Sequence, residues 1–543
     1  QLNDIREDLT AHYKLANDID LDVEPYNEVE GWEPIGEDEN RFTGSLDGDN
    51  YSISKLFINR PETSYVGLFA YVDEAEISNL SLLDVDVTGD RRVGALAGYM
   101  YLVGEGKIGN IDNIHITGNV KGTGGPVGGL IGRSQQVTIN NVASEVNVTG
   151  GLDGGSDIGG IVGNAQNDTF ISNSHSTGEI YSENMRTGGL TGTLWASSIT
   201  NSFSTSDVTG KNNVGGLVGD AGRSSITKSY ATGDVNVTEP ENDALNYFGG
   251  LVGTSSNTDF ENTYATGDVK GSKNTGGLIG NFNGITSKVL NSYSAGKVSG
   301  LENVGGLIGQ VSSGTITHSF YDSETSGQSD TGKGTPKTTA EMKQQSTFTT
   351  SGSDWDFANL WATESGDYIS YPYFGNSEEA PEQDPPPGLA QVGGFAENPR
   401  LIAAAGKKTA VTTAHILFGD DDEVTITRKP YRGRLLLDGT EVVNGDEVLK
   451  TEVEGNELEF EHEGDRTESE YWYTDFLYAT STEERTLHVD LAARGIEYAH
   501  PEGWFLFSSP EENQTVGDLL RNMRTDGYPG STNAGASFPT VYT

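Results

Sequence analysis

A short glycine-rich block recurs along the first 320 residues of the chain. Gly-Gly-Leu-Val-Gly, or a close variant of it, appears nine times, beginning at Gly67, Gly94, Gly128, Gly159, Gly188, Gly215, Gly249, Gly276 and Gly305. Successive copies are 27 to 34 residues apart, so the average period is near 30 residues. Self-similarity at one period predicts a repeat array, in which each unit buries its apolar face only by stacking on its neighbours.

A second block accompanies each copy, ten to thirteen residues further on except after Gly94, where it follows 17 residues later. These blocks begin at Ile77, Ile111, Ile139, Ile171, Ile199, Ile226, Phe260, Val289 and Ile316. A third, short β-prone piece closes most copies, and turns rich in Gly, Asn, Asp or Thr-Gly separate the pieces. None has the length or the 3.6-residue periodicity of a helix. The sequence therefore predicts an all-β fold, a parallel β-solenoid (right-handed β-helix) of about ten coils. At ~4.8 Å per coil, this array is on the order of 50 Å long.

Equivalent positions in successive coils lie above one another in such a stack. The third position of the second block is asparagine in most copies, which predicts a ladder of side-chain amides that stabilises a turn, formed by Asn79, Asn113, Asn141, Asn173, Asn201, Asn262 and Asn291. Lys228 and His318 interrupt it. The leucines of the glycine-rich blocks are expected to face the core, among them Leu217, Leu251, Leu278 and Leu307. The glycine pairs fit corners that need positive φ or close backbone approach.

The overall charge excludes several classes of function. The chain has 34 Lys and Arg against 80 Asp and Glu, a formal charge of −46. Binding to nucleic acid or to anionic membranes rests on Lys and Arg, so neither partner is expected. No apolar run approaches the roughly 20 residues of a membrane-spanning helix. The first residues also lack the basic and apolar regions of a secretion signal, and we expect the sequence to be a fragment of a longer chain.

The repeat itself resembles a known one. The blocks VGGLVG and ITNSFSTSDV, with their variants, are similar to the GLUG repeat of large secreted and surface-attached bacterial proteins, including adhesins and a class of immunoglobulin-cleaving metallopeptidases. The resemblance implies opening coils over residues 1–60, a GLUG-repeat solenoid over 61–321 and a terminal cap over 322–375. It also implies a secreted or cell-surface location.

A different module is expected after the array. Residues 376–388 are acidic and proline-rich, which predicts a semi-rigid linker. Residues 389–493 have strand-length segments and turns without the 30-residue period, a pattern typical of an antiparallel sandwich. This stretch resembles a cadherin-like repeat of the chondroitin-sulfate-proteoglycan type, a module that serves as a spacer in surface proteins. Residues 494–543 remain unassigned.

Calcium is the expected cofactor. The cadherin-like resemblance places acidic residues at Asp420, Asp421, Asp422 and Asp475, and carboxylate oxygens suit Ca²⁺. We therefore predict that Asp420, Asp422 and Asp475 ligate a structural calcium ion. Weaker candidates are the aspartates near the N-terminus, which in the GLUG resemblance serve as turns: Asp18, Asp20, Asp22, Asp47 and Asp49.

Catalytic motifs are scarce in this sequence. There is no HExxH metallopeptidase motif, and without cysteine no thiol nucleophile exists. We therefore expect a non-enzymatic extracellular adhesin fragment that acts as an elongated spacer and binds along an exposed sheet face. Its expected partners are a glycan or protein on a host, a neighbouring cell or the biofilm matrix, and the adjacent domains of a longer chain. The alternatives are a polysaccharide lyase or hydrolase on a β-helix scaffold, and an ice- or mineral-binding surface built from regular threonine rows.

Overall fold

The computed structural model divides the chain into two compact units, Gln1–Val392 and Gly393–Thr543. It describes residues 2–101, 109–238, 246–349, 355–364, 368–375, 386–388, 390–391, 400–404, 408–411, 422–430, 434–454, 458–461, 472–479 and 484–492. Most of the predicted linker over 376–388 and the whole segment over 494–543 lie outside these residues. The two units are described separately below.

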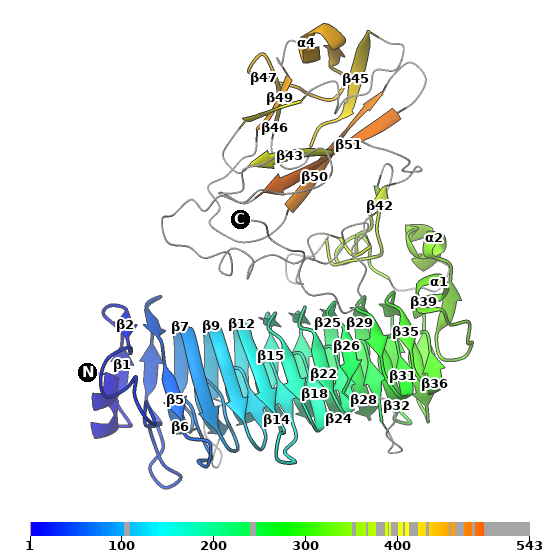
Figure 1. Ribbon diagram of the computed structural model, residues 1–543. Coiled ribbons are helices and arrows are strands. Elements are labelled where there is room, and N and C mark those ends of the chain that lie inside the picture. The colour runs from blue at the N-terminus through cyan, green and yellow to red at the C-terminus, as the bar shows by residue number, and fades with distance from the viewer. Residues whose placement is uncertain are drawn as a thin grey trace, which may run out of the picture. The chain divides into compact units, whose positions relative to one another are not determined.

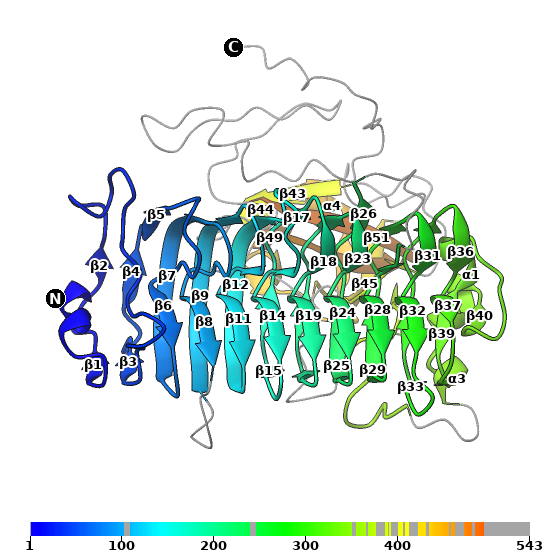
Figure 2. The same cartoon turned by 90° about the horizontal axis from the view of Figure 1, so that it is seen from below.

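The first unit is a parallel β-solenoid of about ten turns with almost no helix in its described part, which confirms the predicted class of the array. Its coils lie side by side from the N-terminus onward (Figure 1). One wall is a nine-stranded sheet, seen face-on in Figure 2, of β6 (Phe69–Val72), β8 (Ala97–Tyr101), β11 (Ile131–Gln135), β14 (Val162–Gln166), β19 (Thr191–Trp195), β24 (Val218–Gly222), β28 (Val252–Ser256), β32 (Ile279–Asn283) and β37 (Ile308–Val311).

Two further sheets complete the coils. A seven-stranded sheet contains β10 (Val127–Gly128), β13 (Ile158–Gly159), β18 (Met185–Gly188), β23 (Asn212–Gly215), β27 (Phe248–Gly249), β31 (Lys273–Gly276) and β36 (Glu302–Gly305). A 24-stranded sheet contains β1 (His12–Lys14), β2 (Ile19–Asp20), β3 (Ser45–Asp47), β4 (Ser52–Ser54), β5 (Phe57–Asn59), β7 (Glu76–Gly89), β9 (Gly109–Gly122), β12 (Val137–Gly150), β15 (Phe170–Ser172), β16 (His175–Ser176), β17 (Ile180–Ser182), β20 (Ser198–Thr200), β21 (Phe203–Ser204), β22 (Val208–Gly210), β25 (Ser225–Ala231), β26 (Val235–Val237), β29 (Asp259–Ala265), β30 (Val269–Lys270), β33 (Lys288–Leu290), β34 (Tyr293–Ser294), β35 (Val298–Ser299), β38 (Thr315–Thr317), β39 (Phe320–Asp322) and β40 (Thr335–Lys337).

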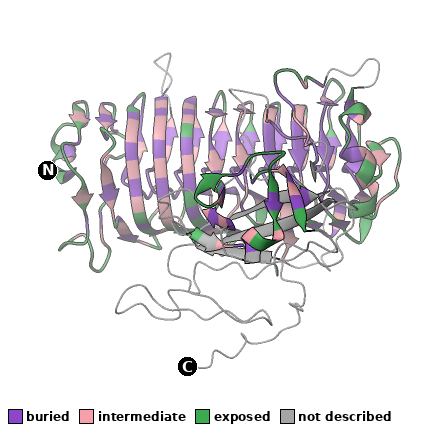
Figure 3. Ribbon diagram, turned by 90° about the horizontal axis from the view of Figure 1, so that it is seen from above, coloured by how far each residue is buried: buried purple, intermediate pink, exposed green. Residues whose placement is uncertain are grey.

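The register of these sheets stacks like residues on like, one coil apart. One row of paired positions runs through Tyr13, Leu46, Ile77, Ile111, Ile139, Ile171, Ile199, Ile226, Phe260, Val289 and Ile316. Buried and more exposed residues alternate along strands such as β12, as Figure 3 shows by colour. Leu217, Leu251, Leu278 and Leu307 are completely buried, so the inward face of the glycine-rich block is confirmed.

Close backbone approach explains the second glycine of each pair. A Cβ atom on Gly216 would lie 2.2 Å from the carbonyl oxygen of Gly250, and one on Gly250 would lie 2.2 Å from that of Gly277. Real Cβ atoms essentially never come so near to another backbone, so the coils could not stack at this distance with any other residue. The sequence left two reasons open for these glycine pairs, a positive φ or a close approach of another backbone. At Gly216 and Gly250 the reason is the close approach of the next coil's backbone.

Positive φ instead occurs at the asparagine ladder. Each predicted asparagine has a φ between 48° and 56°, and Lys228 and His318 adopt 46° and 45° at the same corner. Asparagine tolerates this left-handed conformation better than other residues with a Cβ atom. The amides also bond along the axis, because Asn113 Nδ2 donates to Asn79 Oδ1 at 3.0 Å and Asn141 Nδ2 donates to Asn113 Oδ1 at 3.1 Å.

A stack of aromatic rings runs along the outside of the later coils. His175, Phe203, Tyr230, Tyr264 and Tyr293 lie almost parallel, with ring centroids 4.7 to 5.1 Å apart. The segment after the last coil covers one end of this stack. It contains α1 (Ser323–Ser326), α2 (Thr339–Met342), α3 (Gln345–Phe348), β41 (Tyr368–Ile369) and β42 (Ala390–Gln391), while η1 (Leu2–Glu7) lies at the opposite end of the array.

The second unit contains small, mostly antiparallel sheets. One sheet has the order β43 (Arg400–Ala404), β51 (Glu484–Ala492), β50 (Trp472–Ala479), β45 (Glu423–Arg428) and β48 (Glu447–Leu449). The other has the order β44 (Lys408–Ala410), β49 (Leu458–Glu461), β46 (Arg434–Leu437) and β47 (Thr440–Glu441), and α4 (Lys450–Glu454) follows β48. Ile426, Leu435, Phe460 and Tyr478 belong to one buried cluster, so residues from both sheets share a core.

Candidate functional site

The outer side of the nine-stranded sheet is the candidate functional site, and we call it the nine-stranded face. Two rows of side chains point away from the core along it. The first row consists of Tyr71, Tyr99, Arg133, Asn164, Thr193, Asp220, Thr254, Asn281 and Gln310. The second consists of Tyr101, Gln135, Gln166, Trp195, Gly222, Ser256 and Asn283. The strands of this sheet lie side by side in Figure 2. The first row places a polar or aromatic residue on each of the nine strands, of which Asn164 and Thr193 are buried.

Aromatic rings and guanidinium groups gather at the N-terminal end of this face. We call this group the tyrosine–arginine patch, made of Tyr65, Tyr71, Tyr99, Tyr101, Arg92 and Arg133. The ring pairs Tyr65–Tyr71 and Tyr99–Tyr101 are stacked, with centroids 4.3 and 4.1 Å apart. The Arg92 guanidinium lies 4.7 Å from the centre of the Tyr65 ring, and that of Arg133 lies 5.4 Å from the centre of the Tyr99 ring. These side chains are all partly exposed.

A third arginine, Arg41, contacts this patch from the preceding coil. Arg41 lies 4.6 Å from the centre of the Tyr101 ring and pairs with Asp38 at 2.8 Å and Asp73 at 3.2 Å. The Tyr101 hydroxyl donates to Asp38 Oδ1 at 3.0 Å. Burial, followed by that hydrogen bond to a carboxylate, raises the pKa of Tyr101, so its hydroxyl stays protonated.

Two carboxylates occupy the middle of the face. Asp157 is buried and accepts hydrogen bonds from Thr193 Oγ1 at 2.6 Å and Asn164 Nδ2 at 3.1 Å, while Arg186 Nε lies 2.5 Å from its Oδ1. Asp220 follows Thr193 in the first row. Burial raises the pKa of Asp220 to about 6, with Asp157 adding to the rise and Arg186 opposing it. Asp220 of β24 is thus influenced by the charge of Asp157, which directly precedes β13.

The remaining coils carry neutral polar groups. Asn281 Nδ2 donates to Thr254 Oγ1 at 3.1 Å, and Trp195 stays exposed, with the Arg223 guanidinium 5.4 Å from its ring centre. The first row mixes six residue types, so the described part of this sheet does not form the regular threonine row that an ice- or mineral-binding surface needs.

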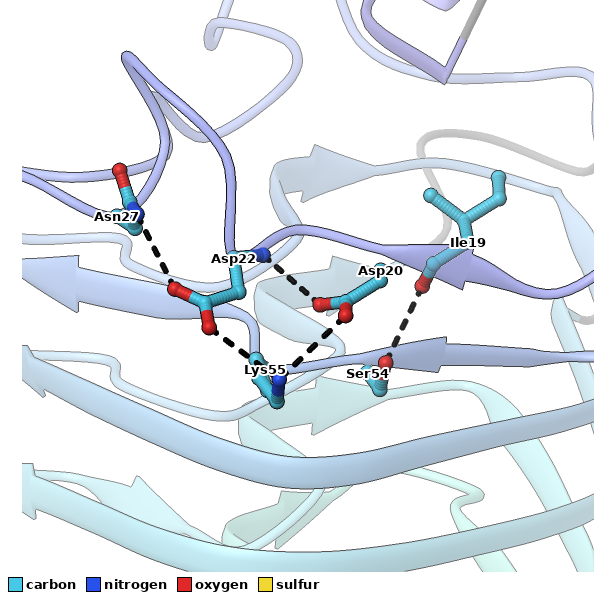
Figure 4. Close-up of polar contacts among 6 residues, drawn as sticks. All are labelled: Ile19, Asp20, Asp22, Asn27, Ser54 and Lys55. Carbon is cyan, nitrogen blue, oxygen red and sulfur yellow. Dashed lines mark hydrogen bonds and ion pairs between the residues drawn. The ribbon is translucent and has the colours of Figure 1, made fainter.

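Lysines occupy the aspartate clusters near the N-terminus. Figure 4 shows Lys55 Nζ between Asp20 and Asp22, at 3.4 and 3.2 Å from their carboxylate oxygens. Lys14 Nζ lies in the same way between Asp47 and Asp49, at 3.4 and 2.8 Å. An ammonium group thus bridges each pair of aspartates and offsets one of its two negative charges.

Asp18 instead ties neighbouring coils together, because its Oδ1 accepts from both the backbone N–H and the hydroxyl of Ser52. These contacts agree with the structural, turn-forming interpretation of the N-terminal aspartates.

Asp422 and Asp475, two of the three residues predicted to bind calcium, lie at distant positions along the ladder of β45 and β50. Asp422 is exposed and directly precedes β45, whereas Asp475 lies within β50. Thr425 faces Ala479 and Arg428 faces Leu477 in this antiparallel pair. Asp422 and Asp475 therefore lie about eight residues apart along the ladder, roughly 25 Å. Asp420 lies outside the described residues, and a site held jointly by Asp422 and Asp475 does not fit this register.

No cluster of three or more metal-ligating side chains occurs in the described part of the chain. Calcium binding by the second unit stays an untested prediction. None of the helices described has the length and apolar composition needed to cross a membrane.

The comparisons with known proteins agree with the repeat pattern. The GLUG motif matches residues 210–236, within the array. The chain contains GLUG repeats. This GLUG-repeat chain is 41% identical over 404 residues to a protein of Evansella cellulosilytica described as a Gly-rich membrane protein, which covers 69% of the chain and 43% of the relative.

Two further relatives match shorter stretches. Halomucin of Haloquadratum walsbyi is 39% identical over 140 residues, covering 24% of the chain and 1% of the relative. The immunoglobulin A1 protease of Streptococcus sanguinis is 29% identical over 233 residues, covering 39% of the chain and 11% of the relative. A solved structure of an IgA1 protease aligns at a TM-score of 0.28 and 19% identity over 62% of the chain and 20% of that structure. The GLUG-repeat chain spans less than half the length of these relatives.

Proposed function

We propose that this chain is the glycan-binding part of a non-enzymatic extracellular adhesin, with the nine-stranded face as its binding surface. The observation that carries the proposal is the uninterrupted outward row from Tyr71 to Gln310, one polar or aromatic side chain per coil. A sugar chain lying along the face would meet the partly exposed Thr254, Asn281 and Gln310 at a spacing of ~4.8 Å, whereas Asn164 and Thr193 are buried. It would also meet the exposed ring of Trp195.

Other observations support a surface role. The relatives include a Gly-rich membrane protein and halomucin, and the charge of −46 favours hydration and disfavours nucleic acid partners. We assign the second unit the part of a cadherin-like spacer, because its sheets share one core and follow the array in the chain. The adhesin would attach its cell to a glycan of a host, a neighbouring cell or the biofilm matrix.

A second candidate function follows from the pair Asp157 and Asp220. Glycoside hydrolysis uses one carboxylate that stays ionised and one that keeps its proton near neutral pH. Asp157 pairs with Arg186 and accepts hydrogen bonds from Thr193 and Asn164, and burial raises the pKa of Asp220 to about 6. The chain would then be a polysaccharide hydrolase or lyase on a β-solenoid scaffold.

A glycan array probed with the whole chain, followed by assays for new reducing ends and unsaturated uronates, separates these functions. The adhesin proposal expects binding without product, weakened by Trp195→Ala and unchanged by Tyr181→Ala on the 24-stranded sheet, where Tyr181 is similarly exposed. Product that disappears in Asp220→Asn would support the enzyme instead. Absence of binding to any glycan would refute both.

A further inference from the structure

The tyrosine–arginine patch holds positive charge that the protein itself does not neutralise. Carboxylates outnumber Lys and Arg side chains by 80 to 34 in this chain. Arg41, Arg60 and Arg186 each form an ion pair with at least one carboxylate. Among the described residues, Arg92 and Arg133 form no ion pair with any carboxylate. Their Nε atoms are buried and lack a hydrogen-bond acceptor. A cation left unpaired in so acidic a protein is open to an external anion.

The two guanidinium groups are held in place before any ligand arrives. Arg92 lies over Tyr65 at 4.7 Å and also approaches Tyr99 at 6.0 Å, while Arg133 lies over Tyr99 at 5.4 Å. Arg133 Nη2 additionally donates to Gln166 Oε1 at 2.8 Å. Stacking on a ring fixes the plane of a guanidinium group. A guanidinium group that is already fixed loses less conformational entropy when it binds a carboxylate or sulfate with two parallel hydrogen bonds.

The neighbouring groups favour a sugar chain as the carrier of that anion. Partly exposed tyrosine rings offer apolar area on which sugar rings can stack, together with hydroxyls that hydrogen-bond. Gln166 and Trp195 continue the second row on the next two coils, and both are at least partly exposed. A polymer running from the patch along the face would thus meet cations first and neutral groups afterwards.

The density of negative charge distinguishes this partner from nucleic acid. Charges interact over about 8 Å at physiological ionic strength, so two arginines act locally in a protein whose net charge is −46. Nucleic acid would bring many closely spaced phosphates against the acidic remainder of the surface. A polysaccharide with one carboxylate or sulfate on each sugar carries its charges further apart than the ~1.7 Å of duplex DNA, so it meets less repulsion from that surface.

We infer that the tyrosine–arginine patch binds an anionic polysaccharide, with Arg92 and Arg133 pairing with its carboxylate or sulfate groups. This inference rests on the proposed glycan-binding function and names the class of glycan. The inference also distinguishes the two ends of the nine-stranded face, because the positively charged end lies at β8 and β11, towards the N-terminus of the array.

The test measures the affinity of the whole chain for polygalacturonate, dextran sulfate and neutral dextran. We expect binding of at least one of the anionic polymers and at least about tenfold weaker binding by the Arg92→Gln, Arg133→Gln double variant. Lys288→Gln is the control, since it removes a positive charge from β33 on the 24-stranded sheet, outside the nine-stranded face, and it should keep its affinity. Comparing polygalacturonate with dextran sulfate shows whether carboxylate or sulfate is preferred.

Each alternative outcome has a definite meaning. Equal affinity for neutral dextran and the charged polymers, or an unchanged double variant, would overturn the anionic assignment and leave the proposed function standing. Tighter binding of DNA or of an acidic peptide would overturn the choice of a polysaccharide. Binding to no glycan would overturn both proposals. If the double variant fails to fold, Arg133→Gln alone, with Arg133→Lys to retain the charge, decides the same question.

Discussion

At the scale of single residues, the corner of each coil imposes a backbone conformation that asparagine suits and lysine does not. Lys228 adopts a φ of 46° where the neighbouring coils have Asn201 and Asn262 at 49° and 53°. Lysine in the left-handed region carries a conformational cost that asparagine largely avoids. The interruption of the ladder is therefore a site of stored strain.

Lys228→Asn should raise the free energy of unfolding by about 0.5–1 kcal/mol. The reciprocal change Asn201→Lys, one coil earlier, should lower it by a similar amount. Chemical denaturation of both variants measures these differences. Loss of stability in Lys228→Asn would mean that the contacts of the lysine side chain outweigh the backbone strain.

Asp220 should make stability depend on pH. Its pKa is raised by burial from 3.8 to about 6 in the folded protein, so the folded state holds this proton more tightly than the unfolded state does. The stability that the proton provides is present below pH 4 and is lost as the pH rises through 6. Asp220→Asn removes this dependence, and by pH 7 the wild type should have lost up to about 3 kcal/mol relative to the variant. Parallel pH profiles for the two proteins would contradict the assignment.

At the scale of elements, the aromatic stack joins the array to its terminal cap. Trp361 is completely buried, lies 5.9 Å from the Tyr264 ring and 4.5 Å from the Phe374 ring, and donates from Nε1 to Asn262 Oδ1 at 3.2 Å. Trp355 similarly donates from Nε1 to the His318 carbonyl at 2.9 Å. The cap thus bonds to the same corner that carries the asparagine ladder.

Trp361→Ala should destabilise docking of the cap by about 3–5 kcal/mol, because a large buried ring leaves a cavity. Limited proteolysis of the whole chain should then cut within 322–375 before the array. Phe203→Ala is the control, since Phe203 lies in the uncovered part of the stack and is only partly buried. Equal resistance of the Trp361 variant and the wild type would show that the cap does not depend on this ring.

Much of this architecture could be predicted from the sequence because it repeats. Equivalent residues occupy equivalent positions in every coil, so the inward leucines and the amide ladder appear as periodic patterns. The outward row of the nine-stranded sheet could not be found in that way, because Tyr99, Arg133 and Asn164 occupy one row without resembling each other. The positions of Asp422 and Asp475 depend on the register of β45 and β50, which no local pattern fixes.

At the scale of the whole molecule, we propose that the solenoid is a rigid support and that the nine-stranded face is its functional surface. The coils stack through backbone contacts too close for a side chain, so the face has little freedom to rearrange. Ligand binding should then change the exposure of side chains on this face alone. Exposed aromatic residues on other sheets provide internal controls.

Hydroxyl-radical footprinting of the whole chain, with and without the glycan that binds it best, tests this claim most directly. We predict that Tyr99, Tyr101 and Trp195 become protected from oxidation when the glycan is bound. Phe170 and Tyr181, which are exposed on the 24-stranded sheet to nearly the same extent as Trp195, should be oxidised equally in both conditions. Protection of Phe170 and Tyr181 with no change at Trp195 would place the binding surface elsewhere and contradict the account.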